Sequence, residues 1–200
     1  MRCFGRLRYV CAAVILSGCT LMGSAQMGST SAKVAPGTQM SPVQAQDELL
    51  NLFESEFMAV AKAMPADKYS FAPAASNFAA SQGAKYEGVR TFAQEISHVT
   101  LANYFFASKI LGEKMPVDPK TINGLTTKDE LLKAAADSFA YAHKAIASIT
   151  PENAYVAIDG ADGLHSRSVL ASFVSAHGFD HYGQMVEYLR MNGIIPPGSK

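Results

Sequence analysis

Proline and glycine divide the chain into four long segments in which apolar residues recur at helical spacing, and this pattern restricts the fold more than any other feature. The first segment begins at Pro42, behind the capping residue Ser41, and is stopped by Pro65. The other three cover residues 88–111, residues 128–149, and residues from about 163–166 to 192. No segment shows the sustained alternation of a half-buried strand. The sequence therefore predicts an all-α protein.

Four helices of roughly 20 residues each favour an antiparallel-type four-helix bundle, in which side chains project inward from facing helices. Residues 64–87 are too rich in proline for a helix or a central strand and are expected to form a long crossover. The chain has 200 residues, 48% of them hydrophobic, which suits one domain with a real core. We expect the bundle to cover residues 42–197.

The first 25 residues have the features of an export signal. A positively charged start is followed by an apolar stretch, residues 9–18, that is too short to span a bilayer. The segment Leu16-Ser17-Gly18-Cys19 resembles a bacterial lipobox, which would be cleaved before Cys19 and lipidated on its thiol. Ordinary signal peptidase cleavage after Ala25 is the alternative. We therefore expect an exported protein that is either periplasmic or anchored to the bacterial envelope by lipid.

Residues 26–41 are rich in Gly, Ser and Thr and are expected to form a flexible linker. The 17 basic and 17 acidic residues of the chain balance, but Arg2, Arg6 and Arg8 lie in the leader, so the mature chain is mildly acidic. Without a Lys/Arg cluster, nucleic acid is not an expected partner. Membrane contact is expected only through the lipid anchor. A homodimer is compatible with the sequence.

Two histidines of the last helical segment are the main candidates for metal ligands. His177 and His181 are four residues apart, which places them on one face of a helix. They share this stripe with apolar residues: Val169, Phe173 and Met185. Imidazoles directed at a core need partners, and a metal ion is one. Hydrogen bonds to backbone or to Gln184 and Tyr104 are the alternative.

A third ligand could come from His98, near the middle of the second segment. The same side of that helix is apolar, as expected of a helix packed against two neighbours. His98, His177 and His181 could then form a three-histidine site with positions left for water or substrate, as catalytic zinc sites do. His143 and His165 share no helical face with another histidine and are interpreted as structural residues.

Several stretches together resemble the DinB family of four-helix metal-binding bacterial proteins. They are residues 88–98 with 102–106, the closing His177-x-x-x-His181-Tyr-Gly-Gln motif with its continuation to residue 197, and the crossover residues 64–73. The resemblance covers about residues 42–197. It implies an up-down-down-up bundle and a divalent metal, zinc or nickel, held by one histidine of the second helix and two of the last. On this chain those ligands are His98, His177 and His181.

Further expectations concern the residues around the site. Asn103, Tyr104 and Gln184 are expected to surround the ligands. Many relatives have an arginine after the second histidine, but this chain has Tyr182, so the anion contact of that arginine is not expected here.

The resemblance implies a transferase or isomerase in which the metal holds a low-molecular-weight thiol as its thiolate. A hydrolase that attacks a small-molecule substrate with metal-activated water is a variant, and it needs a general base, for which Asp180, Glu95 and Tyr104 are candidates. The catalytic residues are otherwise unknown.

Two further hypotheses involve no catalysis. A metal-binding envelope module would sense or buffer metal, or use it to hold the bundle closed, whereas a metal-free interaction domain requires that the three histidines do not converge. An open metal position beside a cavity of about 300 Å³ or more favours an enzyme, and a closed tetrahedral site favours structure.

Overall fold

The computed structural model describes residues 34–79, 83 and 85–199. The expected export signal, with Cys19, and the first part of the expected linker lie outside these residues. The chain divides after Thr38 into two units, and all elements discussed below belong to the second unit, which begins at Gln39. Its four long helices are α1 (Pro42–Ala63), α2 (Phe92–Leu111), α4 (Lys128–Ala147) and α5 (Arg167–Met191).

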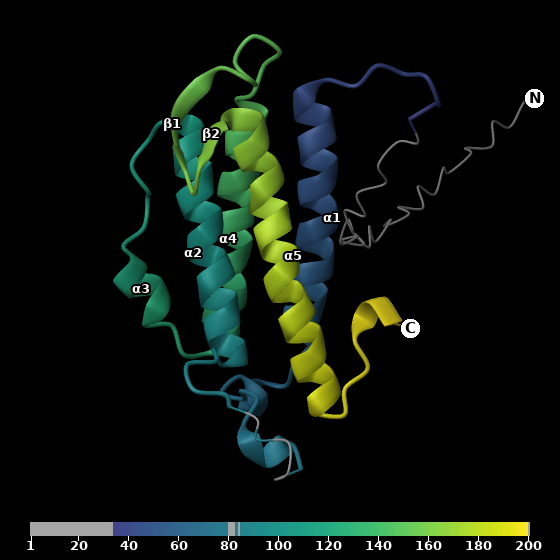
Figure 1. Ribbon diagram of the computed structural model, residues 1–200, viewed down its shortest axis with the longest axis vertical. Helices are drawn as coiled ribbons and strands as arrows, with labels where there is room; N and C mark the ends of the chain where they lie inside the picture. The colour runs from purple at the N-terminus through teal and green to yellow at the C-terminus, as the bar shows by residue number, and fades with distance from the viewer. Residues whose placement is uncertain (1–33, 80–82, 84, 200) are drawn as a thin grey trace, which may run out of the picture. The chain divides into compact units, whose positions relative to one another are not determined.

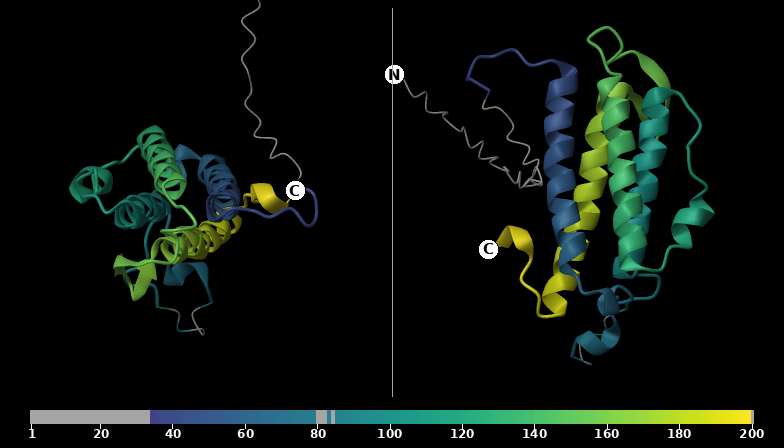
Figure 2. Two further views of the ribbon diagram at one scale, coloured as in Figure 1. Left: turned by 90° about the horizontal axis from the view of Figure 1, so that it is seen from above. Right: turned by 180° about the vertical axis from the view of Figure 1, so that it is seen from behind.

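The four long helices form a bundle in which α1 and α5 run in one direction and α2 and α4 run in the other (Figure 1). Helix α2 packs against α4 and α5, and α1 packs against α5 and α4. The view along the helices shows the four arranged around a common core (Figure 2). The expected all-α, up-down-down-up bundle is therefore confirmed. Within the described residues, no helix is both long enough and apolar enough to cross a membrane.

Side-chain caps explain where the helices begin. Ser41 and Thr127 each accept a hydrogen bond from the backbone N–H three residues later, in a reciprocal capping box. Thr91 and Gln94 form the same box, so α2 begins at Phe92 and not at residue 88 as expected. Gly112 ends α2 in the left-handed conformation, with φ of 71°.

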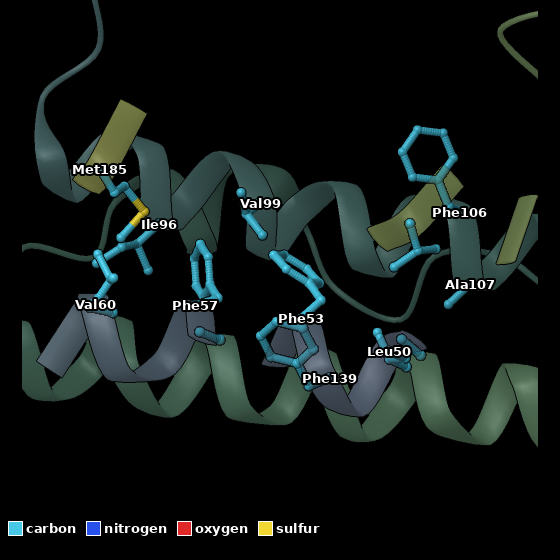
Figure 3. Close-up of a cluster of buried hydrophobic side chains, with 14 of the residues drawn as sticks. Leu50, Phe53, Phe57, Val60, Ile96, Val99, Phe106, Ala107, Phe139 and Met185 are labelled. Carbon is cyan, nitrogen blue, oxygen red and sulfur yellow. The ribbon is translucent and has the colours of Figure 1, made fainter. Parts of the chain in front are cut away.

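The core is built around aromatic rings from α1 and α4 (Figure 3). Phe53 and Phe57 on α1 lie edge-on to Phe139 on α4, with ring centroids 5.3 and 5.8 Å apart. Apolar side chains from α1, α2 and α5 fill the space around these rings, and all are fully buried or nearly so: Leu50, Val60, Ile96, Val99, Ala107 and Met185. Burial of these large side chains on helical stripes explains why the periodicity predicted the bundle.

The connections between the long helices contain short elements that were not expected from the sequence. The crossover from α1 to α2 includes the 3-10 turns η1 (Ala66–Lys68) and η2 (Ala75–Asn77). Helix α3 (Pro119–Asn123) lies between α2 and α4. A small antiparallel hairpin of β1 (Ala157–Ala161) and β2 (Leu164–Ser166) precedes α5. These elements are too short to produce a recognisable period, and the hairpin is the one departure from an all-helical body among the described residues.

Candidate metal centre

The three predicted histidines converge between two adjacent helices. His98 comes from α2, and His177 and His181 come from successive turns of α5. One ring nitrogen from each lies within 4.8 Å of the other two. The Nε2 atoms of His98 and His177 are 3.2 Å apart. A metal-free interaction domain requires that the three histidines do not converge. The observed convergence does not support that hypothesis.

The chain at His177 is shaped to let α1 approach α5 closely. Gly178 follows His177, and a Cβ atom at Gly178 would lie 2.0 Å from Cζ of Phe53. The absence of a side chain at Gly178 therefore allows the Phe53 ring to pack directly on the helix that carries two of the histidines. The packing of α1 thus supports the position of His177 and His181 from behind.

The donor set fits a divalent cation. In a tetrahedral site with bonds of about 2.0–2.1 Å, two ligand nitrogens are separated by about 3.3 Å, close to the distance between His98 and His177. Burial, together with the positive charge of Arg90, lowers the pKa of His98 to about 4. Burial also lowers the pKa of His177. Both rings are therefore neutral near pH 7 and carry a lone pair that a cation can accept.

Glu95 orients the third imidazole. Its carboxylate oxygen lies 2.7 Å from Nδ1 of His181, and the two residues are 1% and 6% exposed. A carboxylate only accepts hydrogen bonds, so Nδ1 of His181 carries the proton and donates it, which leaves Nε2 as the lone-pair nitrogen. Carboxylate–histidine pairs of this kind surround many metal sites in proteins. Glu95 is therefore a positioning residue.

Comparison with known families gives an independent result. A model of the DinB superfamily matches residues 49–185, which is more than half of the chain and includes all three histidines. The chain belongs to the DinB superfamily. A comparison with curated proteins gave no match.

Two of the residues expected around the ligands lie elsewhere in this DinB-superfamily chain. The amide of Asn103 donates to the hydroxyl of Ser138 on α4, 3.1 Å away, and the ring of Tyr104 packs against Tyr141 on α4. They follow His98 by five and six residues, which turns them more than 100° away from it around the helix. This corrects our expectation for Asn103 and Tyr104, including the role of Tyr104 as a general base.

The other candidates for the surroundings of the ligands were Gln184, Glu95 and Asp180. Gln184 does lie beside the triad, with its Nε2 3.4 Å from Nδ1 of His181. Glu95 is buried and engaged by His181, so the general-base role considered for it is replaced by the positioning role. Asp180 is exposed, and its carboxylate lies 3.4 Å from the amide of Gln184.

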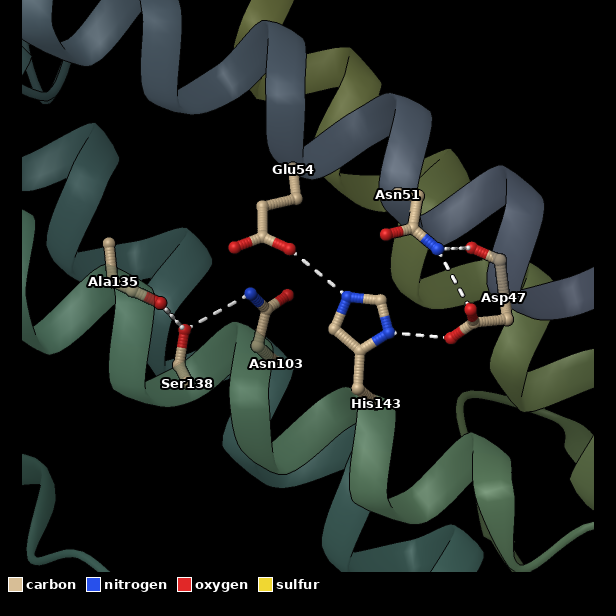
Figure 4. Close-up of polar contacts among 7 residues, drawn as sticks. All are labelled: Asp47, Asn51, Glu54, Asn103, Ala135, Ser138 and His143. Atoms are coloured by element: carbon tan, nitrogen blue, oxygen red, sulfur yellow. Dashed lines mark hydrogen bonds and ion pairs between the residues drawn. The ribbon is translucent and has the colours of Figure 1, made fainter. Parts of the chain in front are cut away.

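Three residues that we did not assign to the metal site, His143, His165 and Tyr182, take no part in the triad. His143 on α4 lies between two carboxylates of α1, with Nδ1 2.6 Å from Asp47 and Nε2 3.0 Å from Glu54 (Figure 4). His165 is exposed on β2. The ring of Tyr182 packs edge-on against Phe179. His143 has a structural role, as interpreted, but its two acidic partners could not be identified from helical spacing within one segment.

The triad opens on two cavities. An apolar cavity of about 360 Å³ is lined by His98, Leu101, Ala102, Phe105, Phe106, Met115, Pro119, Asp162, Phe173 and His177. A more polar cavity of about 470 Å³ is lined by Gly88, Arg90, Ala93, Gln94, Ser97, His98, Leu101, Asn123 and Leu125. Because His98 and His177 are only half-buried, a cation held here would be accessible from the apolar cavity.

Proposed function

We propose that this DinB-superfamily protein binds a divalent metal ion through His98, His177 and His181 and acts on a small-molecule substrate. The observation that carries the proposal is the convergence of three ring nitrogens within 4.8 Å beside a cavity of about 360 Å³. Imidazole nitrogen suits zinc and nickel, which are the metals that we propose. Three protein ligands with an open side are typical of catalytic sites, whereas structural zinc sites are closed by four.

A bound cation would supply Lewis acid chemistry, lowering the pKa of a water molecule or thiol that coordinates it. The chain provides the rest of the site. Glu95 holds His181 in one tautomer, and the apolar cavity excludes water from the side on which a substrate would lie. We propose a transferase-like or hydrolase-like reaction on this basis. Asp162, the carboxylate that lines the apolar cavity, is the residue best placed to accept a proton from a ligand there.

A non-catalytic metal-binding module remains the second candidate. The observation that favours it is the half-exposed position of His98 and His177, which also suits reversible loading of a metal that is sensed or buffered. Such a module would bind metal at the triad but would bind no organic molecule in the adjoining cavity.

We also propose that the protein is exported, with its leader removed before Cys19 or after Ala25. The support is the pattern of the leader sequence itself, an arginine-rich start followed by a short apolar stretch. The mass of the mature protein tests this directly, because a lipidated Cys19, a free N-terminus at Gln26 and a retained Met1 have different masses.

Metal analysis of purified protein tests the proposed function. We expect about one zinc or nickel ion per chain in the parent, and less than about a tenth of that in His177→Ala or His181→Ala, because two imidazoles hold a cation much more weakly than three. His165→Ala is the matched control, since His165 is exposed on the hairpin and should leave the metal content unchanged. Full metal content in the triad variants would refute the proposal.

A further inference from the structure

The two cavities beside the candidate metal centre are adjacent and differ in chemical character. Both are lined by His98 and Leu101, so they meet at the exposed edge of the triad. Three phenylalanine rings dominate the apolar cavity: Phe105, Phe106 and Phe173. The other cavity carries polar side chains from α2 and from the end of α3: Gln94, Ser97 and Asn123. A molecule that extends across the triad would therefore meet apolar surface at one end and polar groups at the other.

Arg90 gives the polar cavity an uncompensated positive charge. Its guanidinium forms no hydrogen bond or ion pair with any residue in the described part of the chain, although it lines the cavity. Some other basic side chains do have a partner, for example Lys109 with Asp159 at 3.1 Å. A guanidinium has five N–H donors in a fork that matches a carboxylate. The free fork of Arg90 is thus available to an anionic ligand.

Charges on the two sides of the triad have opposite sign. Asp162, at the tip of the hairpin, is the charged residue other than histidine that lines the apolar cavity. Asp162 lines the same cavity as His177, and Arg90 lines the same cavity as Ser97 and His98, so the two charges lie on different sides of the triad. An anionic group would be repelled from the Asp162 side and attracted to the Arg90 side. This polarity sets the orientation of a ligand with one charged end.

We propose that the ligands of this site are organic monocarboxylates, with the carboxylate held by Arg90 in the polar cavity and an aliphatic or aromatic body in the apolar cavity. The inference rests on the proposed function and narrows its substrate class. The polar cavity contributes one cationic side chain, so it matches one negative charge, and a phosphate dianion would be only half neutralised. The ligand would cross the exposed edge of His98 and so place its middle part beside the metal centre.

Calorimetric titration with a series of probes tests the proposal on the zinc-loaded and the metal-free protein. The probes are acetate, butyrate, hexanoate and octanoate, with octanamide as the uncharged match of octanoate. We expect affinity to rise about threefold to fourfold for each methylene that enters the apolar cavity. Octanamide should bind about tenfold more weakly than octanoate, because it offers Arg90 no charge.

Variants assign the two ends of the ligand. Arg90→Gln should weaken octanoate binding about tenfold and leave octanamide unchanged, whereas Arg190→Gln is the matched control, since Arg190 lies outside both cavities. Phe105→Ser should weaken the dependence of the affinity on the chain length of the probe. Because Phe105 is 41% exposed, we expect the fold to tolerate this change. Thermal unfolding of each variant verifies that it is folded.

The outcomes separate this inference from the proposed function. Equal octanoate affinity in the parent and Arg90→Gln would overturn the inference, because the carboxylate would then bind the metal alone or bind elsewhere. Affinity that does not depend on chain length would overturn it as well. A parent that binds octanoate through Arg90 but takes up no zinc would refute the metal site and leave the ligand class standing.

Discussion

At the scale of single residues, the contact between Glu95 and His181 links the buried core to the candidate metal centre. An unpaired carboxylate at a position that is 1% exposed would carry a large desolvation cost, and the Nδ1–H of His181 offsets it. The same hydrogen bond directs Nε2 of His181 toward the other two histidines. One hydrogen bond therefore stabilises a buried charge and also orients a metal ligand.

Glu95→Gln tests this role. The amide oxygen can still accept from Nδ1 of His181, but it lacks the negative charge that makes the imidazole a better donor to a cation. We expect the zinc affinity, measured by competition with a chelator, to fall about 10- to 100-fold. The helical content should be unchanged. Glu187→Gln, an exposed glutamate on α5, should bind zinc like the parent. Parental affinity in Glu95→Gln would show that the contact serves the core alone.

At the scale of elements, two glycines of α5 have opposite roles. Gly178 faces α1, where the Phe53 ring occupies the space that a Cβ atom would need. Gly183 has no atom within 4 Å of the corresponding position. The first glycine is required by helix packing, and the second only lowers the intrinsic stability of the helix.

Alanine substitutions should therefore change stability in opposite directions. Gly178→Ala forces Phe53 or the backbone to move and should lower the free energy of unfolding by about 1–3 kcal/mol. Gly183→Ala should raise it by about 0.5–1 kcal/mol, which is the difference in helix propensity. Urea denaturation of the two variants and the parent measures both. A stabilised Gly178→Ala protein would contradict the close approach of α1 and α5.

Helices α1 and α4 are joined by the charged contacts of His143 (Figure 4). Hydrogen bonding to Glu54 is the largest influence that raises the pKa of His143, with Asp47 adding to it, while burial acts in the opposite direction. Because the pKa is higher in the folded protein than in the unfolded chain, the contact stabilises the fold below the unfolded pKa of about 6.5. The stabilisation is lost as the pH rises through the folded pKa.

His143→Gln should accordingly reduce stability at pH 6 by about 1 kcal/mol, a modest value because all three side chains are partly exposed to solvent. At pH 9 the imidazole of the parent is neutral, and the difference between parent and variant should shrink toward zero. Denaturation curves of both proteins at the two pH values make the comparison. A difference that grows with pH would show that the contact does not favour the protonated imidazole.

At the scale of the whole molecule, the bundle does not depend on metal for its core. The aromatic cluster of Phe53, Phe57 and Phe139 comes from α1 and α4, whereas the three histidines come from α2 and α5. The apolar side chains that surround it are almost fully buried. A body of this size buries enough apolar surface to fold unaided, so metal should add stability without being obligatory.

Removal of metal should leave a folded, helical protein with a lower melting temperature. Zinc at 100 to 1,000 times its Kd contributes about 3 to 4 kcal/mol to the native state, which corresponds to a rise of about 10 °C in the melting temperature. Circular dichroism melts of the stripped protein with and without added zinc measure this. An unmoved melting temperature would contradict binding to the native state.

Much of the bundle could be predicted because its signals are local. Pro42 behind Ser41, and Pro65 after the first helix, marked boundaries by backbone chemistry alone. The start of α2 was placed at residue 88 because Val89 continues the apolar stripe, although the Thr91–Gln94 capping box marks the true start. Helix α3 and the hairpin carry too few residues for a periodic signal.

The surroundings of the candidate site were harder to predict, because they depend on which faces meet. Glu95 precedes His98 by three residues and shares its helical face, so spacing alone could have indicated it as a neighbour of the triad. Asn103 and Tyr104 were chosen for closeness in sequence, which is a poor guide around a helix. The acidic partners of His143 come from another helix, and no spacing rule within one segment connects them.

Part of the surface that would select a ligand comes from outside the two helices that carry the histidines. His98, His177 and His181 lie on α2 and α5, whereas Met115, Pro119 and Asp162 come from the connections that border the apolar cavity. Evolution or a protein engineer could therefore exchange these connections and obtain new ligand preferences without rebuilding the helices. A single scaffold could in this way give rise to many specificities, each inheriting the same three imidazoles.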